Sequence, residues 1–216
     1  MFIHHLIPSG IPQASQTLAR AFRDDPLVSY MVPELSRREL LLLRFYRWLL
    51  RYGLTYGEIH VSSPGHEAVA MWLPPEASHG TLLGWVRSGA LLLPFRVGPR
   101  FLLRCWKYAD HISQLRLRHT PFPHWFLQLL GVAPDCQRQG HATRLLGVML
   151  QRLERAKVPC CLDTVRQANV DFYERFGFRV AEESHVPGTN IDCWLMVRTW
   201  AGERTSFQPQ VMVAVF

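Results

Sequence analysis

Apolar side chains recur along this chain at two spacings, and these spacings predict helices and strands in alternation. Helical spacing over residues 12–22 and 36–53 predicts two helices in the first quarter of the chain. Shorter apolar runs at residues 3–7, 56–62 and 67–73 predict strands. A short turn joins the last two strands, so we expect them to pair as antiparallel neighbours.

Polar residues mark where the two early helices should begin and end. Asp24 and Asp25 precede Pro26, and the residue before a proline disfavours the helical conformation, so the first helix should stop here. Ser36 and Glu39 have the spacing of a capping box and would start the second helix. That helix is expected to end at a glycine, Gly53.

The second half of the chain continues the alternation after a long helical insertion. The insertion covers residues 79–119 and is interrupted at Pro94 and at Gly98-Pro99. The predicted elements that follow are a strand ending at Pro134, a helix from Ala142, a strand at 159–163, a helix at 168–176, and strands at 178–182 and 191–198. The apolar tail at 199–216 fits either an edge strand or a partner contact.

Length and composition favour one soluble domain over residues 1–216. The chain has 216 residues, 48% of them hydrophobic, without a repeat or a Gly/Ser/Pro-rich linker. No apolar run approaches the ~20 residues of a membrane helix, and the first residues lack the charge and length of a signal peptide. We therefore expect a cytoplasmic protein that has no membrane partner.

The net charge and the cysteines limit which partners, disulfides and metal sites are expected. A net charge of +7 and a pI near 9.5 favour nucleic acid or a phosphorylated small molecule as partner. Five cysteines without a C-x-x-C pair, two of them adjacent at Cys160 and Cys161, indicate reduced thiols rather than disulfides or a zinc site. His66-Glu67 lacks the second histidine of an H-E-x-x-H motif, so no metal is predicted.

The connection between the strand ending at Pro134 and the following helix has the features of an anion site. Residues 137–140 stand where a helix leaves its first backbone N–H groups unpaired. Gly140 would let the backbone approach a bulky group, and Arg138 and Arg144 add positive charge. A pyrophosphate would suit this turn, although an ordinary strand-to-helix connection has the same spacing.

Two motifs resemble the signatures of the GNAT family of N-acetyltransferases. QRQGHA at residues 137–142 is similar to the acetyl-CoA signature Q/R-x-x-G-x-G/A, and NVDFYERFGF at 169–178 is similar to the second signature. Within the family, residues 124–198 resemble puromycin N-acetyltransferase. The resemblance implies an α/β fold with a mixed, mostly antiparallel sheet flanked by helices and a helical insertion between the third and fourth strands. The fourth and fifth strands would run parallel and splay apart at their C-terminal ends.

The same resemblance implies an acetyl-CoA-dependent enzyme that transfers the acetyl group directly to the primary amine of a small molecule. Tyr173 would protonate the leaving thiolate, and Asn169 would hold the pantetheine arm near the sulfur. The backbone would bind pantetheine at Leu130, Gly131 and Val132, and the pyrophosphate would bind at Gln137, Arg138, Gln139, Gly140, His141 and Ala142. The anionic cofactor accounts for the basic charge, so we expect no nucleic-acid partner, and a monomer or homodimer.

The general base remains open at this stage. Gln128 stands at a position of the fourth strand where many members of the family carry a glutamate or histidine. The remaining candidates are His124, Glu76, Asp163 or a water chain.

Two further alternatives also remain. Asp24 and Asp25 could attract a cationic amine instead of merely ending a helix, and Cys136 could act as a nucleophile. A non-catalytic module that binds acyl-CoA or nucleic acid is the competing function, motivated by basic stripes at residues 37–51 and 100–118.

Overall fold

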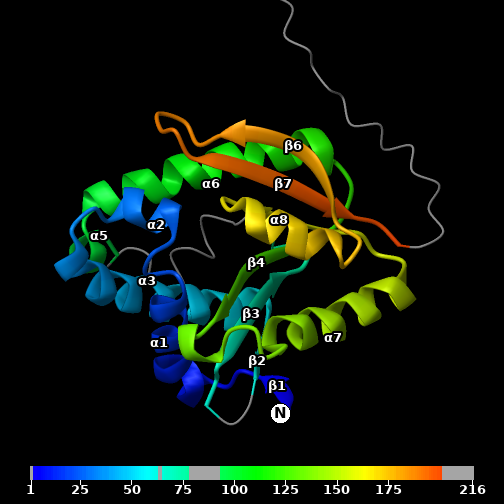
Figure 1. Cartoon of the computed structure of the whole chain (residues 1–216), viewed down its shortest axis with the longest axis horizontal. Coiled ribbons are helices and arrows are strands. Elements are labelled where there is room, and N and C mark those ends of the chain that lie inside the picture. The colour runs from blue at the N-terminus through cyan, green and yellow to red at the C-terminus, as the bar shows by residue number, and fades with distance from the viewer. Residues whose placement is uncertain (1, 63–64, 78–92, 201–216) are drawn as a thin grey trace, which may run out of the picture.

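A single seven-stranded sheet organises the molecule (Figure 1). The structure, a computed structural model, describes residues 2–62, 65–77 and 93–200. The strand order is β1-β2-β3-β4-β5-β7-β6. The strands are β1 (Ile3–His5), β2 (Glu58–Ser62), β3 (Ala68–Leu73), β4 (Trp125–Val132), β5 (Cys160–Thr164), β6 (Arg179–His185) and β7 (Asp192–Arg198). Among these strands β4 and β5 pair in parallel and the other neighbours pair antiparallel. The predicted mixed, mostly antiparallel sheet is confirmed.

Helices cover both faces of the sheet. The longer elements are α1 (Ile11–Ala21), α3 (Leu35–Tyr56), α6 (Pro99–His119) and α7 (His141–Ala156). The shorter ones are η1 (Pro8–Gly10), α2 (Pro26–Met31), α5 (Leu93–Val97), η3 (Pro134–Cys136) and α8 (Gln167–Glu174). On β3, Val69 and Met71 pack into the hydrophobic cluster shared with α1, α3 and α6, and Trp72 packs into the cluster shared with α7 and α8. All six residues of β3 are buried because both faces are covered.

The boundary predicted for the second helix was wrong at both ends. Helix α3 starts at Leu35 with Glu34 as its N-cap residue, without a side-chain cap, so the capping box of Ser36 and Glu39 does not form. The helix also runs through Gly53 to Tyr56. A Cβ at Gly53 would come within 2.7 Å of the Met71 side chain, so this glycine allows close packing of α3 on the sheet rather than ending the helix.

Pro26 starts a short helix after α1 has already ended. Helix α1 stops at Ala21, and Pro26 is the first residue of the short α2, in which a proline is tolerated. Asp25 caps α2 by accepting a hydrogen bond from the Leu27 N–H at 3.0 Å. Periodicity did not predict α2 because six residues are too few to establish a helical repeat.

The helical insertion lies between β3 and β4, as predicted, with α5 and α6 inside residues 93–119. The first part of the predicted insertion, residues 79–92, and most of the predicted tail, residues 201–216, lie outside the described residues. No helix of the described chain is long and apolar enough to cross a membrane. The single-domain organisation stays a prediction.

The parallel pair at the centre of the sheet separates after three residues. Trp125, Phe126 and Leu127 pair with Cys160–Leu162, and β4 then continues to Val132 while β5 ends at Thr164. On the other side of β4, Met71 pairs with Leu129 and Trp72 with Leu127, so Gln128 forms a β-bulge at the point of separation. This is the splayed pair that the resemblance predicted.

Candidate active site

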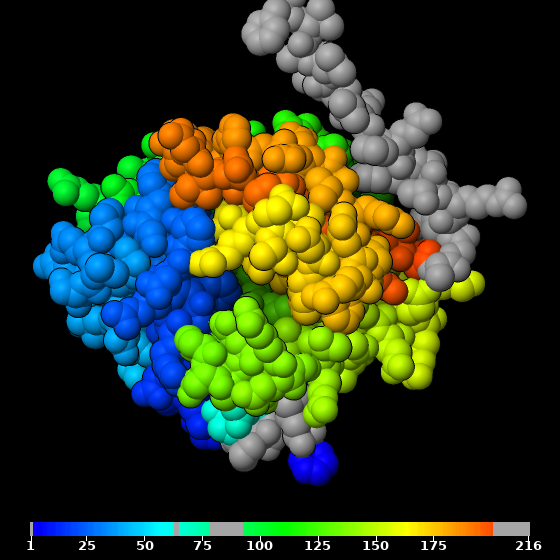
Figure 2. Space-filling model, in the orientation of Figure 1, coloured from blue at the N-terminus to red at the C-terminus, as the bar shows by residue number. Residues whose placement is uncertain are grey.

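The space-filling view shows a hollow where β4 and β5 separate (Figure 2). Dark green atoms of β4 form its floor. Yellow atoms of α8, yellow-green atoms around the start of α7 and blue atoms of the α1–α2 region surround it. The motifs singled out in the sequence therefore meet at one hollow, although they lie far apart along the chain.

Part of the β4 backbone faces this hollow. Ala133 N–H donates to Glu67 O on the β3 side at 2.8 Å, and backbone direction alternates along a strand. The backbone groups of Gly131 therefore point toward β3, and those of Leu130 and Val132 point toward the open edge. Gln137 Nε2 donates to Val132 O at 3.5 Å, which agrees with this direction.

Gly131 has a different structural role. A Cβ on Gly131 would lie 2.8 Å from Leu18 and 3.0 Å from Phe22 of the α1 region. Its missing side chain lets α1 and the residue after it pack directly on β4. The backbone edge and the wall of the hollow thus depend on the same glycine.

The loop before α7 adopts a conformation typical of anion-binding turns. Arg138 has φ 60° and Gly140 has φ 81°, both in the left-handed region. For a residue other than glycine this region costs roughly 1–2 kcal/mol. Around Gly140 a Cβ would meet no atom within 4 Å, so its backbone conformation, not a lack of space, favours glycine. Residues 137–140 are exposed and no side chain caps α7, which leaves first-turn N–H groups available to an anion.

Some side chains of this loop and of the first turn of α7 are exposed to solvent, and others make hydrogen bonds within the protein. Arg138 and Arg144 are exposed. Gln139 Nε2 donates to Asp135 O at 3.1 Å and thereby braces the loop. His141 is buried, with Nδ1 3.1 Å from Ser62 Oγ, so its backbone N–H rather than its ring faces the anion position.

Helix α8 presents two of the predicted residues one turn apart. Asn169 Nδ2 donates to Thr164 Oγ1 at 3.0 Å, which ties the helix to the end of β5. Tyr173 is 8% exposed and its ring packs edge-on against Phe172 and Phe178. Its hydroxyl forms no hydrogen bond within the described part of the chain. Burial raises the pKa of Tyr173, and the negative charge of Asp163 raises it further.

Asp163 lies at the fork between the two parallel strands. It follows Leu162, the last β5 residue paired with β4, so it stands level with the Gln128 bulge. The Tyr108 hydroxyl of α6 donates a hydrogen bond to its Oδ2. Burial raises the pKa of Asp163 to about 6, against the opposing effects of the Tyr108 hydrogen bond and the Arg116 charge.

The other two candidate bases lie at the opposite end of β4. His124 is 2% exposed; its Nδ1 is 2.7 Å from Phe122 O and its Nε2 is 3.0 Å from Arg116 Nη2. Because a guanidinium only donates, Nε2 accepts, Nδ1–H donates, and the ring is neutral with both nitrogens engaged. Glu76 is exposed and lines a surface groove together with His124. Neither residue reaches the fork between β4 and β5.

The acidic pair at the end of α1 has a structural role. Besides capping α2, Asp25 Oδ2 accepts from Arg166 Nε at 3.2 Å, and Asp24 O accepts from Arg166 Nη2 at 2.6 Å. Arg166 precedes α8, so it joins the α1–α2 turn to the α8 side of the hollow. The Asp24 side chain is 83% exposed, with Arg38 Nη1 3.9 Å away.

Cys136 is poorly suited to act as a nucleophile. Partial burial raises the pKa of its thiol, and the carboxylates of Asp135 and Glu67 raise it further. A raised pKa lowers the population of the reactive thiolate at neutral pH.

Sequence reasoning missed the role of Tyr108. Its spacing placed it on the apolar face of the insertion helix, and its hydroxyl reaches a carboxylate 55 residues away in sequence. No local pattern signals such a contact.

The side chains of Cys160 and Cys161 lie on opposite faces of the sheet, since neighbouring strand residues point to opposite faces. All five cysteines are free thiols.

Comparison with known proteins agrees with this geometry. Residues 104–180 match the family model described as Acetyltransferase (GNAT) domain. Three solved structures are similar to the chain over nearly its whole length. The "histone acetyltransferase HPA2 and related acetyltransferase" from Corynebacterium glutamicum is 17% identical, with 94% of this chain and 98% of that chain covered and a TM-score of 0.66.

The ribosomal-protein-S18-alanine N-acetyltransferase from Escherichia coli is 18% identical, with 95% and 99% covered and a TM-score of 0.52. An agmatine N-acetyltransferase is 15% identical, with 92% and 98% covered and a TM-score of 0.53. The finer likeness to puromycin N-acetyltransferase stays a prediction. The chain therefore has the fold of the GNAT acetyltransferases, and its residues 104–180 match the model of that domain.

Proposed function

We propose that this protein is an acetyl-CoA-dependent N-acetyltransferase that acetylates the primary amine of a small molecule. The observation that carries the proposal is that Asp163 follows the last β5 residue paired with β4 and is near enough to Tyr173 for its charge to raise the pKa of that phenol. A carboxylate and a phenol supply the two proton transfers that the acylation of an amine requires.

Three features around the hollow support acetyl-CoA as the co-substrate. The backbone groups of Leu130 and Val132 suit the amides of pantetheine, because they lie on the edge of β4 beyond its last pair with β5. The uncapped turn at residues 137–142 suits the pyrophosphate, and Asn169 suits the arm near the sulfur. When bound, acetyl-CoA supplies the acetyl group as an activated thioester.

Asp163 and Tyr173 then divide the proton transfers. Asp163 takes a proton from the ammonium form of the acceptor, directly or through a water, and leaves a neutral amine that can attack the thioester carbonyl. The C–N bond forms, the C–S bond breaks, and Tyr173 gives its proton to the departing thiolate. The acylated nitrogen loses its second proton, which returns through water to the Tyr173 phenolate, and Asp163 releases its own proton to solvent. A carboxyl pKa of about 6 suits Asp163 to serve as a base near neutral pH.

Aromatic residues beside the fork support an acceptor with an apolar or aromatic body. Phe22 lies against Gly131 on β4, and the rings of Phe22 and Tyr46 are 5.8 Å apart. Tyr108 contributes a further ring beside Asp163. By their names, similar proteins act on a ribosomal-protein alanine and on agmatine, so the fold itself accommodates protein and small-molecule amines.

The decisive experiment is an amine-panel screen with acetyl-CoA that measures release of free thiol. We expect turnover with small primary amines, highest for those with an aromatic or apolar body. Activity confined to peptides would refute the acceptor class and leave acetyl transfer standing. Saturable acetyl-CoA binding without thiol release from any amine would identify a non-catalytic binding module.

A second experiment tests the base. In the wild type we expect kcat/KM to rise with pH as Asp163 ionises near pH 6. Asp163→Asn should lower kcat by at least about 100-fold and remove this rise. Glu76→Gln is the matched control, because Glu76 is an exposed carboxylate at the other end of β4 and should leave the profile unchanged. An unchanged profile in Asp163→Asn would assign the base to another group.

Direct transfer is distinguished from a covalent acyl-enzyme at Cys136. Cys136→Ala should retain activity, because the raised pKa of this thiol disfavours the nucleophilic thiolate. Loss of turnover in Cys136→Ala with full activity in Tyr173→Phe would reject direct transfer.

A further inference from the structure

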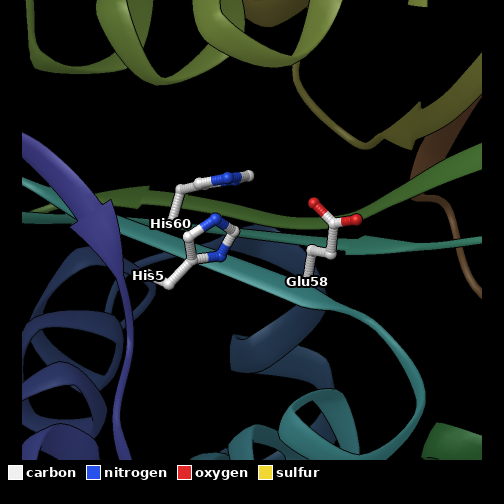
Figure 3. Close-up of side chains that lie close together, drawn as sticks. All are labelled: His5, Glu58 and His60. Atoms are coloured by element: carbon white, nitrogen blue, oxygen red, sulfur yellow. The ribbon is translucent and has the colours of Figure 1, made fainter. Parts of the chain in front are cut away.

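Three side chains with metal-binding atoms gather at the first edge of the sheet, away from the hollow. His5 on β1 pairs directly with His60 on β2, and Glu58 is two residues from His60 on the same strand. Directly opposed residues and residues two apart share a face of the sheet. One candidate ligand atom from each side chain lies within 4.8 Å of the other two. Figure 3 shows the two imidazole rings one above the other and the Glu58 carboxylate beside them.

His60 is the buried member of this group. It is 5% exposed, and its Nδ1 has no hydrogen-bond partner within the described residues. A buried polar atom without a partner is destabilising, so it requires an explanation. The ring centroids of His5 and His60 are 4.5 Å apart.

Glu58 already pairs with one cation and has capacity for a second. Arg152 Nη1 of α7 lies 2.8 Å from Oε1 and 2.6 Å from Oε2, and its guanidinium also lies 5.1 Å from the Trp125 ring centroid. An ionised carboxylate offers about four lone-pair positions on its two oxygens. One oxygen can therefore bind a metal while the other keeps its contact with Arg152.

We propose that His5, Glu58 and His60 form a binding site for one divalent transition-metal ion, with Zn²⁺ as the best match. Two imidazole nitrogens and one carboxylate oxygen are a ligand set typical of zinc, and a water completes four-coordination. Zinc requires nitrogen and oxygen ligands at ~2.0–2.2 Å, so the three side chains would close around the ion on binding.

The site would fasten β1 to the sheet. Strand β1 has three residues and pairs with β2 alone in the described sheet. Anything that binds the folded chain in preference to the unfolded chain stabilises it, so metal binding at this edge would hold the N-terminal strand in place. The motif search of the sequence found no such site because its ligands come from two strands that lie far apart in sequence.

The test is a calorimetric titration of the chelator-treated full chain with Zn²⁺. We expect one saturable site per chain. His5→Ala should weaken binding at least 10-fold, and because His5 is exposed this variant should fold normally. His4→Ala is the matched control: the neighbouring histidine is also exposed, pairs with Val61 and faces the other side of the sheet, so binding should be unchanged.

Arg152→Gln separates this proposal from a purely structural role of the cluster. Removing the competing guanidinium should tighten Zn²⁺ binding several-fold, and Glu58→Gln should weaken it at least 10-fold. Co²⁺ gives a further signature, because four-coordinate Co²⁺ with nitrogen and oxygen ligands absorbs visible light. Zn²⁺ should also raise the Tm of the wild type and not that of His5→Ala.

Three results would overturn the proposal. They are the absence of saturable binding, equal binding by the wild type and His5→Ala, or equal loss in His4→Ala and His5→Ala. His60→Gln tests the buried ligand, and if this variant fails to fold, the exposed His5 still decides the question. None of these measurements depends on acetyl transfer, so the proposal stands or falls separately from the proposed enzyme activity.

Discussion

At the scale of single residues, the burial of Asp163 destabilises its charged form and also gives it a pKa suited to the proposed base. Its pKa rises from 3.8 to about 6 because the folded chain buries the carboxyl group. The folded state therefore holds the proton more tightly than the unfolded state. The stabilising contribution of this protonation is fully present below about pH 4 and is lost as the pH rises through 6.

We therefore expect Asp163→Asn to stabilise the protein while it inactivates the enzyme. The amide oxygen still accepts from Tyr108, and the buried charge is removed, so the free energy of unfolding at pH 8 should rise by about 1–3 kcal/mol. Near pH 4 the two proteins should be equally stable. Urea denaturation at both pH values measures the effect, and a destabilised variant at pH 8 would contradict it.

Tyr173→Phe tests the proposed acid with the smallest possible change. The ring contacts with Phe172 and Phe178 remain, and only the hydroxyl is lost. We expect kcat to fall about 100-fold or more with KM little changed, because the proton transfer matters in the transition state. Steady-state thiol release measures kcat, and calorimetric binding of acetyl-CoA is the control. An unaltered kcat would leave Tyr173 as a packing residue.

At the scale of elements, alanine substitutions at two glycines should change the free energy of unfolding in opposite directions. Gly57 caps α3, and a Cβ there would overlap the backbone carbonyl oxygen of Trp72. Gly147 lies inside α7, where a Cβ would meet no atom within 4 Å.

Gly57→Ala should lower the free energy of unfolding by about 1–3 kcal/mol, because backbone must move to admit the methyl group. Gly147→Ala should raise it by about 0.5–1 kcal/mol, because alanine favours the helix and nothing obstructs its side chain. Thermal and urea denaturation of both variants provide the comparison. If both changes have the same sign, the close approach of α3 to β3 does not control stability.

At the scale of the whole molecule, the net charge of +7 should favour capture of an anionic cofactor. The exposed Arg138 and Arg144 stand beside the proposed pyrophosphate turn. We expect kcat/KM for acetyl-CoA to fall several-fold between about 50 and about 500 mM salt. Over this range the Debye length falls from above about 10 Å to well below it, so the attraction between the protein and the cofactor is screened. S-acetylpantetheine, which lacks the phosphates, should show little salt dependence. Equal salt dependence of the two donors would show that charge does not guide cofactor binding.

The sequence determined the elements whose signals are local. The glycine in the turn before α7, the helical repeat after it and the alternation of strands and helices depend on neighbouring residues, so they could be predicted from spacing. The two signatures also predicted the splayed pair β4–β5. Prediction from local sequence was wrong where a residue serves a tertiary contact. Gly53 makes room for Met71 instead of ending a helix.

The tertiary structure alone decided which distant side chains meet. Tyr108 reaches Asp163, Arg166 reaches Asp25, and His5 stands opposite His60 because strand order and register bring them together. Periodicity records which face of an element is apolar, but it contains no information about the partner across the sheet. The choice of candidate base, the Arg166 contact across the hollow and the proposed metal site could therefore be found only from the packed structure. The proposed anion-binding turn could be predicted from the local sequence.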